Sequence, residues 1–417
     1  MIGSAVSLIC ALILWSVIGT SDLSKMRAAF LLGGIVPLLL AFAASFSTSR
    51  LIQKNQYKTL AAGLTFYLKD RLLAGTFAAL LFFFIYSLSL LAFPASLEPF
   101  LVWVFLLGVS FDLVRLCIRR SLRYLQLPFL IGKMEEELVH AIGNMDEKRA
   151  FELLSIVIEA CTTAMLKKKI YVATSLLSAI QRLTEVYVQE LARVELQGRL
   201  SPSGEGGPSF FDKVNYLCLY VCERLEWMNE NAIRGSMRPV AIEIMTTFGR
   251  LSLFFSRHSP DLAIHPLRFL LKCAHEAQNI GEQEIVTRSI LALSETCKAF
   301  IRLSQAKNQS FKGLIFECLS TMEEIVKMVY LQNKEINSAL LIQPFAEIGE
   351  FMGTKQALTC PDRDEIFNAL RRVFVQFQSL QMVTSNMEEV ITSAQDTSSS
   401  FQEDLPFITR PDEGQGQ

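Results

Sequence analysis

The chain has 417 residues, 51% of them hydrophobic and 19% charged, with a formal net charge of −1. The near-neutral total hides an asymmetry: up to Arg120 there are ten Lys and Arg against four Asp and Glu, and from Ser121 onward thirty against thirty-seven. A C-terminal part that is net negative and lacks a basic stripe repels phosphate backbones, which argues against nucleic-acid binding. The positive charge lies in the apolar N-terminal part, where it would meet anionic lipid.

Four apolar stretches crowd the first 118 residues and predict a transmembrane domain at residues 1–120. Charged side chains are absent from residues 1–21, 28–48 and 72–97, and each run supplies the roughly 20 apolar residues that cross a hydrocarbon core of about 30 Å. The fourth stretch is uncharged only as far as Asp112. We expect spans at about residues 2–20, 28–47, 72–93 and 99–118. A cleaved signal peptide is the alternative to the first span, although a basic start is lacking.

The distribution of Lys and Arg predicts the orientation of these spans. The loop at residues 50–71 carries five Lys and Arg against one acid, four Arg residues follow Asp112, and the turn at residues 93–99 has only Glu98. The positive-inside rule then places both termini in the cytoplasm. Trp15 and Trp103 would lie toward the outer interface, where indole rings are favoured. A bacterial inner membrane is the expected location.

Residues 121–392 predict a cytosolic α-helical domain, so the whole chain is expected to be all-α. Val286, Ile290, Leu293, Cys297 and Phe300, for example, alternate in steps of four and three, which is the apolar stripe of an amphipathic helix. Helices are expected to begin near Glu147, Ile170, Phe211, Ser236, Asp261, Gly281, Ser310, Asn333 and Arg363. Two such helices make a unit of roughly 45 to 50 residues, close to the HEAT and armadillo periods. No consensus residue recurs in register, so an α-solenoid and a compact helical bundle both remain open.

Two segments interrupt or follow this domain. Residues 198–209 are rich in Gly, Ser and Pro and predict a flexible insertion, and residues 393–417 predict a disordered tail. The run Lys167-Lys168-Lys169 falls in a predicted turn between helices, where it would be solvated or would touch an anionic leaflet.

Asp112 and Arg115 form a candidate functional pair within the fourth span. Their spacing of three residues allows them to pair on one side of a helix, which reduces the energetic cost of both charges near the membrane. The carboxylate could belong to a proton or ion path. The alternative is that both side chains only anchor the helix by reaching the polar boundary.

The nine cysteines show no disulfide framework, as expected in a reducing compartment. Cys218 and Cys222 lie four residues apart, and Cys273 and His275 lie two apart on another predicted helix. These four side chains could hold zinc on facing helices, but neither pair has a zinc-finger spacing. Buried free thiols are the favoured interpretation, and no metal site or cofactor is predicted.

The chain contains no phosphate-binding loop, no nucleophile elbow and no H-E-x-x-H arrangement, so we predict no catalytic residue. The expected function is that of an integral membrane protein presenting a helical protein-interaction domain, a scaffold or adaptor, in the cytoplasm. Its partners would be the lipid bilayer and a cytosolic protein of unknown identity; a homo-oligomer stays open. The alternative is a channel or transporter subunit with a regulatory cytosolic domain. Such a path usually displays several polar groups at membrane depth.

Overall fold

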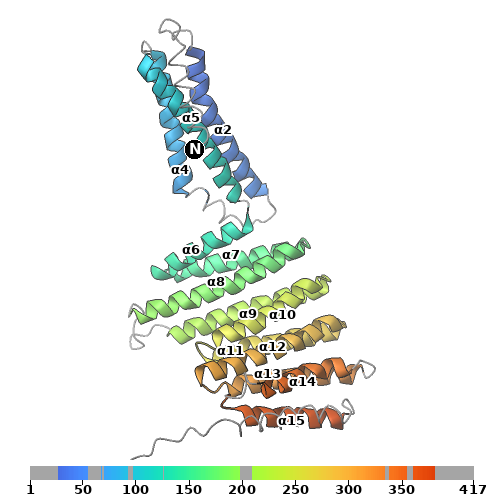
Figure 1. The fold of residues 1–417 in the computed structure, drawn as a ribbon. Helices are drawn as coiled ribbons and strands as arrows, with labels where there is room; N and C mark the ends of the chain where they lie inside the picture. Colours follow the sequence, from blue (N-terminus) through green and yellow to red (C-terminus); the bar gives the residue numbers. More distant parts are fainter. Residues whose placement is uncertain are drawn as a thin grey trace, which may run out of the picture. The chain divides into compact units, whose positions relative to one another are not determined.

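The computed structural model describes residues 27–54, 67, 70–92, 97–124, 126–197, 209–333, 338–354 and 360–380. Every regular element within these residues is an α-helix and none is a strand, so the all-α prediction is confirmed (Figure 1). The predicted first span, residues 198–208 of the predicted insertion at 198–209, and the tail at residues 393–417 lie outside the described residues; Ser209 is described and caps the start of α9. The chain divides into two compact units, Met1–Thr163 and Ala164–Gln417.

The first unit begins with three apolar helices that have the length and composition to cross a membrane. The described helices are α2 (Arg27–Lys54), α4 (Arg71–Ala92), α5 (Leu97–Arg123), α6 (Leu127–Gly143) and α7 (Glu147–Leu166), which runs across the unit boundary. Candidate spans lie at Phe30–Leu51, Arg71–Leu91 and Glu98–Arg123. Three of the four predicted spans therefore correspond to long apolar helices, and a four-helix anchor is not confirmed.

Helices α2, α4 and α5 all pack on one another. Near the start of α2 and α5, the rings of Phe30 and Trp103 meet edge to face with centroids 5.0 Å apart. Near the other end, the Cys117 thiol of α5 faces the Ala41 carbonyl oxygen of α2 at 3.9 Å. Helices α2 and α5 are therefore parallel, and α4 runs antiparallel to both. The end of α2, the start of α4 and the end of α5 meet at one end of this bundle.

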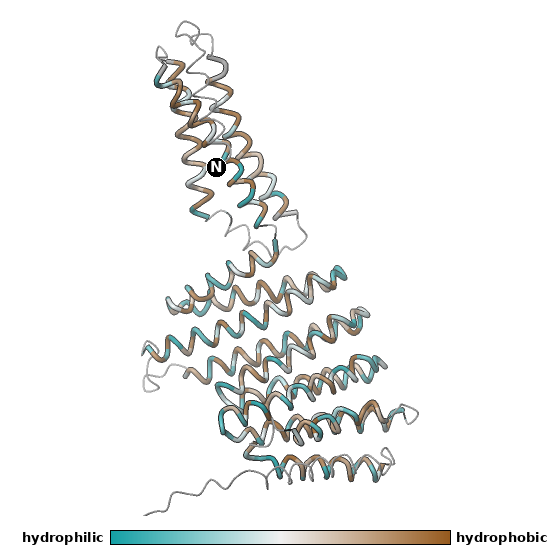
Figure 2. The backbone as a smooth tube through the Cα atoms, viewed as in Figure 1, coloured by the Kyte–Doolittle hydropathy of each residue, from teal (hydrophilic) through white to brown (hydrophobic). Residues whose placement is uncertain are grey.

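Large apolar side chains point outward from these three helices, whereas hydroxyls lie inside. Phe42 is 63% exposed and Phe82 is 68% exposed, but Ser87 and Ser110 are buried. Both serine hydroxyls donate to carbonyl oxygens of their own helix, at 2.9 and 2.7 Å. An apolar exterior of this kind suits lipid, because lipid exerts no hydrophobic pressure on it. Figure 2 shows the contrast with the mixed colouring of the later helices.

Two adjacent glycines allow α2 to approach both neighbours closely. A Cβ atom on Gly33 would lie 2.4 Å from Trp103 Cζ2, and one on Gly34 would lie 2.7 Å from Ser87 Cβ. Trp103 Nε1 donates to Ser87 Oγ at 2.9 Å, so the indole joins α5 to α4 inside the bundle. The Trp103 ring is buried in the bundle, where its N–H finds a hydroxyl partner, and its depth in a membrane stays a prediction.

The substitution Gly33→Ala should destabilise the bundle, because its methyl group would collide with the Trp103 ring; overpacking of this kind costs about 1–3 kcal/mol. Gly75→Ala on α4 is the matched control, since nothing lies within 4 Å of its added Cβ. Thermal unfolding of the detergent-purified protein should show a lower midpoint for Gly33→Ala and no loss for Gly75→Ala. Equal midpoints would contradict the close approach.

The second unit is a stack of helices in two layers (Figure 1). Its helices are α8 (Ile170–Leu196), α9 (Phe210–Arg234), α10 (Arg238–Phe255), α11 (Pro260–Ile280), α12 (Gln283–Lys307), α13 (Lys312–Gln332), α14 (Ser338–Gly353) and α15 (Arg363–Ser379). All the extensive contacts among these helices join a helix to the next one or the next but one. Even-numbered helices form one layer and odd-numbered helices the other, a solenoid-like arrangement.

Side-chain bonds between helices of the same layer recur at a spacing of 49 residues. Arg268 bonds to Glu317 at 3.3 Å, His275 to Glu324 at 3.2 Å and Lys298 to Glu347 at 3.4 Å. Lys327 reaches Gln376 at the same spacing. The first two pairs are substantially exposed and contribute little stability, about 0–1 kcal/mol each. They do show that successive helix pairs stack in one register, close to the predicted period of 45 to 50 residues.

The predicted helix starts agree with the structure to within a few residues. Helices α7, α8 and α15 begin at the predicted residues, whereas α14 begins at Ser338 rather than near Asn333. Helix α6 had no predicted start. It begins four residues after α5 ends, with Pro128 in its first turn, where the missing N–H of proline costs no hydrogen bond.

Five turns between helices share one geometry, with a single residue in the left-handed region after the helix. These residues are Met145, Lys168, Ser236, Gly281 and Asn308. In each turn, the N–H of the following residue donates to the carbonyl oxygen five residues earlier, at 2.8 to 3.2 Å. This bond satisfies a carbonyl that the helix end leaves unpaired. The predicted Lys run therefore lies in the turn that ends α7, where cations also favour the helix dipole.

Lys168→Gly should stabilise the protein by about 1 kcal/mol, because φ is 52° at this position and only glycine adopts the left-handed region without strain. Lys167→Gly removes the same charge from a residue outside the left-handed region and should bring no gain. The midpoints of thermal unfolding of the two variants test this difference. A gain for both would assign the effect to the lost charge instead.

Candidate functional site

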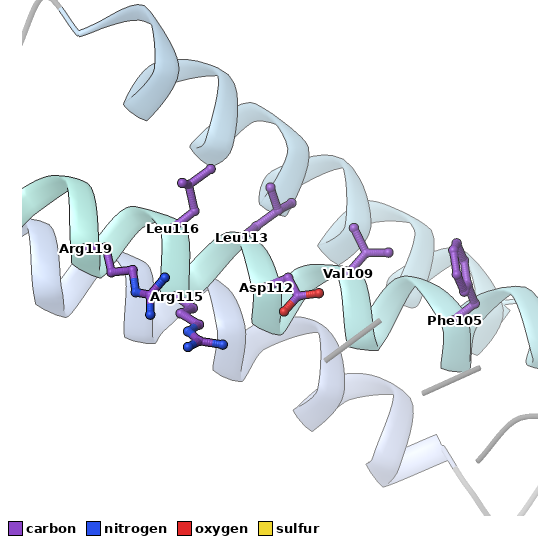
Figure 3. A pocket seen from close by; sticks show the side chains of 7 residues that line it. All are labelled: Phe105, Val109, Asp112, Leu113, Arg115, Leu116 and Arg119. Carbon is purple, nitrogen blue, oxygen red and sulfur yellow. The ribbon is translucent and has the colours of Figure 1, made fainter. Parts of the chain in front are cut away.

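The predicted pair Asp112 and Arg115 lies on α5, with both side chains on one side of the helix (Figure 3). They border a hollow of about 540 Å³, and every described residue that lines it belongs to α5. Asp112 is half-buried and Arg115 is exposed. Val114 and Cys117, which face the bundle interior, are buried. The pair therefore lies outside the core of α2, α4 and α5 rather than within it.

A second polar site, which the sequence interpretation did not single out, lies at the end of the bundle where α4 begins. Asp70 immediately precedes α4, and its Oδ1 accepts the Leu72 N–H at 3.0 Å. The carboxylate thus caps the helix, as Asp commonly does at this position. Asp70 lies two residues before the uncharged run that begins at Leu72, and this was the local signal in the sequence.

The second carboxylate oxygen of Asp70 binds two side chains from the end of α5 and just after it. Arg120 Nε donates to Oδ2 at 2.8 Å, and the Tyr124 hydroxyl donates to the same atom at 2.7 Å. Burial opposes ionisation of Asp70, but these donors and the Leu72 N–H outweigh it and lower its pKa. Burial and the neighbouring carboxylate raise the pKa of Tyr124. Asp70 therefore remains an anion and Tyr124 a neutral donor.

Tyr67 connects the same end of the bundle to α2. Its hydroxyl bonds to Ser45 of α2 and, at 3.0 Å, to Ser121 of α5. Its ring meets the Tyr124 ring edge to face at 5.2 Å. Phe129 of α6 contacts the Tyr124 ring at 5.0 Å and lies 5.2 Å beneath the Arg120 guanidinium. Four helices thus converge on one buried polar cluster.

A shallow depression of about 400 Å³ opens beside this cluster. It is lined by residues of both charges: Asp70, Arg71, Arg120, Tyr124, Lys133, Glu136, Glu137 and His140. Several of these charges are paired already, since Lys133 binds Glu136 and Glu137 accepts from Arg149 of α7 at 3.2 Å. Paired charges of this kind suit a structural junction between α5, α6 and α7 better than an acid–base catalyst.

Asp70→Asn should lower stability by about 2 kcal/mol, because it leaves the largely buried Arg120 without its counter-charge. The pKa of Asp70 is lower in the folded than in the unfolded protein. Its contribution to the free energy of unfolding is therefore complete above the ordinary pKa of 3.8 and is lost as the pH falls through the lowered pKa. The difference between wild type and variant should therefore be largest at neutral pH. Thermal unfolding across pH measures it.

Glu136→Gln is the control for this experiment, since it removes an exposed ion pair from the same depression. Its unfolding midpoint should stay near that of the wild type. Equal losses for both variants would mean that Asp70 acts only through net charge.

The cysteines proposed as alternative zinc ligands lie in the helical core. Cys218, Cys222 and Cys273 are fully buried, and the Cys218 thiol faces the Leu262 carbonyl oxygen at 3.7 Å. Burial raises the pKa of Cys222 and of Cys273, which disfavours the thiolate that binds zinc. His275 bonds to Glu324 on the surface instead. Among the described residues, no group of three or more His, Cys, Asp or Glu could hold a metal ion.

Helix α9 presents a stripe of aromatic side chains on its outer face. Tyr216 is 62% exposed, Trp227 is 44% exposed, and Tyr220 between them is half-buried. The Arg224 guanidinium lies 5.4 Å from the centre of the Tyr220 ring. Tyrosine, tryptophan and arginine are the residues that dominate binding at protein interfaces. We define Tyr216, Tyr220, Arg224 and Trp227 as the α9 stripe.

Comparison with known proteins does not assign the chain to a family. No protein-family model matches it, and no curated protein is significantly similar in sequence. One solved structure, a circular tandem repeat protein with novel repeat topology and enhanced subunit contact surfaces, matches with 13% identity over 91% of this chain and 97% of that chain. Its TM-score of 0.36 is too low to support an argument. The class is thus defined by the fold alone: three long apolar helices followed by stacked helix pairs.

Proposed function

We propose that this protein is a multi-pass membrane protein of a bacterial inner membrane that presents an α-solenoid of HEAT- or armadillo-like helix pairs to a cytosolic protein partner. The α9 stripe is the observation that carries this proposal. Stacked helix pairs expose a long surface without needing it for their own packing, and such surfaces commonly serve protein recognition. In this function the protein acts by binding and uses no catalytic residue or cofactor.

The membrane location rests on the outward-facing apolar side chains of α2, α4 and α5. Basic residues at the end of α5, including Arg119 and Arg123, follow the apolar span. The end of α2, the start of α4 and the end of α5 lie at one end of the bundle, consistent with a cytoplasmic side for that end. The N-terminus would share that side if residues 2–20 also span the membrane.

The channel or transporter alternative finds less support. Aromatic rings fill the space between the three described apolar helices, with Phe30, Phe83, Phe100 and Trp103 in one buried cluster. The buried Ser87 and Ser110 hydroxyls donate to carbonyl oxygens of their own helices, and Ser87 also accepts from Trp103. On the described apolar helices, Asp112 lies on the side of α5 that faces away from this cluster.

A photo-reactive amino acid placed at Trp227 should cross-link a discrete cytosolic protein in living cells. The same probe at Ser178, an exposed residue of α8, is the control and should give no such adduct. Trp227→Ala should weaken the purified complex about thirtyfold, the loss expected for an interface tryptophan worth about 2 kcal/mol. Trp227→Phe should retain most of the affinity.

Equal adducts at both probe positions would refute a specific interface at the α9 stripe. Adducts that contain only this chain would show that the α9 stripe binds a second copy of the protein rather than a cytosolic partner. Recovery of the protein in the soluble fraction would refute the membrane location independently of either result.

A further inference from the structure

A groove of about 310 Å³ lies between α10 and α12, which are neighbours in the even-numbered layer (Figure 1). Its lining residues recur in steps of three and four along each helix, as at Ile242, Thr246 and Gly249 of α10. They therefore come from one side of each helix. Helix α9 belongs to the odd-numbered layer, so the groove is a different surface from the α9 stripe and has no part in the function proposed above.

Two small residues leave the space that forms this groove. A Cβ atom on Gly249 would lie 2.5 Å from Thr296 Oγ1 and 3.7 Å from the Ala292 carbonyl oxygen, so α10 and α12 approach each other closely at this point. Gly249 is buried, and Ala292 is half-buried and adds only a methyl group. Neither residue has a side chain that fills the space above it, so the surface is hollow there.

Apolar side chains surround the hollow. Ile242 and Leu253 of α10 and Leu291 of α12 all line it, and all three are half-buried. The hydroxyls of Thr246 and Thr296 donate to carbonyl oxygens of their own helices, at 3.1 and 2.7 Å, so both donors are already satisfied. Single apolar side chains on a surface are ordinary, but several around one concave site favour the binding of an apolar group.

One of the three charged residues that line the groove has no partner. Arg250 bonds to Glu243 at 3.3 Å, and Glu295 bonds to Lys298. Arg288 is exposed and forms no hydrogen bond or ion pair with any residue that the structure describes. A guanidinium offers a planar set of donors that matches a carboxylate. The groove is therefore complementary to an apolar group that lies next to an acidic one.

The spacing of these groups determines which ligand fits. Arg288 lies four residues before Ala292 on α12, which is about 6 Å along the helix axis. An extended peptide rises about 3.3 Å per residue and points alternate side chains to the same side, so residues two apart in it span that distance. A helix has a diameter of about 10–12 Å and is too wide to enter a groove of about 310 Å³. The groove thus matches an extended segment.

We propose that the groove between α10 and α12 binds an extended acidic peptide segment of a protein partner. A large apolar side chain of this segment enters the groove beside Leu291 and covers Gly249 and Ala292. An acidic side chain two residues away pairs with Arg288. The apolar contact removes hydrophobic surface from water, and the ion pair fixes the register of the peptide. Nucleic acid is a poor ligand, because the chain from Ser121 onward is net negative.

Selection of random peptides displayed on phage tests the chemistry of this ligand, with the full-length, detergent-purified protein as the target. The enriched peptides should share a large apolar residue two positions from Asp or Glu. Selection on the Arg288→Glu variant should enrich Lys or Arg there instead, because the substitution reverses the charge that the peptide meets. Lys307→Glu makes the same change at an exposed residue in the last turn of α12, outside the groove, and should leave the acidic preference unchanged.

A fluorescein-labelled copy of an enriched peptide gives the affinity by fluorescence anisotropy. Binding should be about tenfold weaker for Arg288→Glu than for the wild type, since an ion pair becomes a repulsion. Ala292→Phe should remove the binding, because the ring fills the groove, while circular dichroism shows an unchanged fold. Trp227→Ala, on the α9 stripe, should leave the affinity unchanged, so failure of this inference and failure of the proposed function are distinguishable.

Three outcomes would overturn the proposal. Enriched peptides without an acidic residue, or no enriched peptide at all, would mean that Arg288 recruits no carboxylate. An acidic preference that persists in Arg288→Glu would assign that preference to another site. An affinity that is unchanged in folded Ala292→Phe would place the peptide outside the groove. If Ala292→Phe fails to fold, the comparison of Arg288→Glu with Lys307→Glu decides alone.

Discussion

Large apolar side chains point outward in α2, α4 and α5 and inward in α8 to α15, and this reversal governs the rest of the structure. Phe42 and Phe82 are exposed on the first group, whereas Phe248 and Phe300 are completely buried in the second. Each arrangement suits one solvent. The hydrophobic effect in water stabilises the buried apolar core of α8 to α15. Close packing and buried hydrogen bonds stabilise α2, α4 and α5 in lipid. In the proposed membrane location, the chain changes its solvent within a few residues of the end of α5.

The Asp70 cluster lies where this change occurs. A carboxylate at the start of α4 complements the partial positive charge of that helix end, and Arg120 near the end of α5 complements the opposite end of its helix. Oδ1 of Asp70 caps α4 and Oδ2 pairs with Arg120, so one carboxylate serves both the helix end and the ion pair. Phe129 extends the cluster to α6 through two aromatic contacts. Charge-assisted bonds and the aromatic contacts of Phe129 thus hold this end of the bundle and α6 together.

Apolar periodicity was sufficient to predict the long helices, because the stripes at positions such as Val286 to Phe300 repeat over several turns. The Asp70 cluster could not be predicted in the same way, since Asp70 and Arg120 lie fifty residues apart and each looks like one more charge near a span. The burial of Trp103 could not be predicted either, because composition cannot reveal a Ser87 partner on another helix. The spacing of Asp112 and Arg115 did predict that they share one side of α5, but not which side.

The repeat is specified less by recurring large residues than by small ones beneath the turns. Ala141, Ala164, Ala232, Ala277 and Ser304 each accept the bond that closes a left-handed turn, and all five are buried. A small side chain four residues before the turn leaves room for the chain to fold back over the helix end. Such residues are too common to form a visible consensus, yet they allow the same left-handed turn at the end of successive helices. Exposed side chains such as Trp227 lie outside these turns, so the geometry of the turns does not fix their identity.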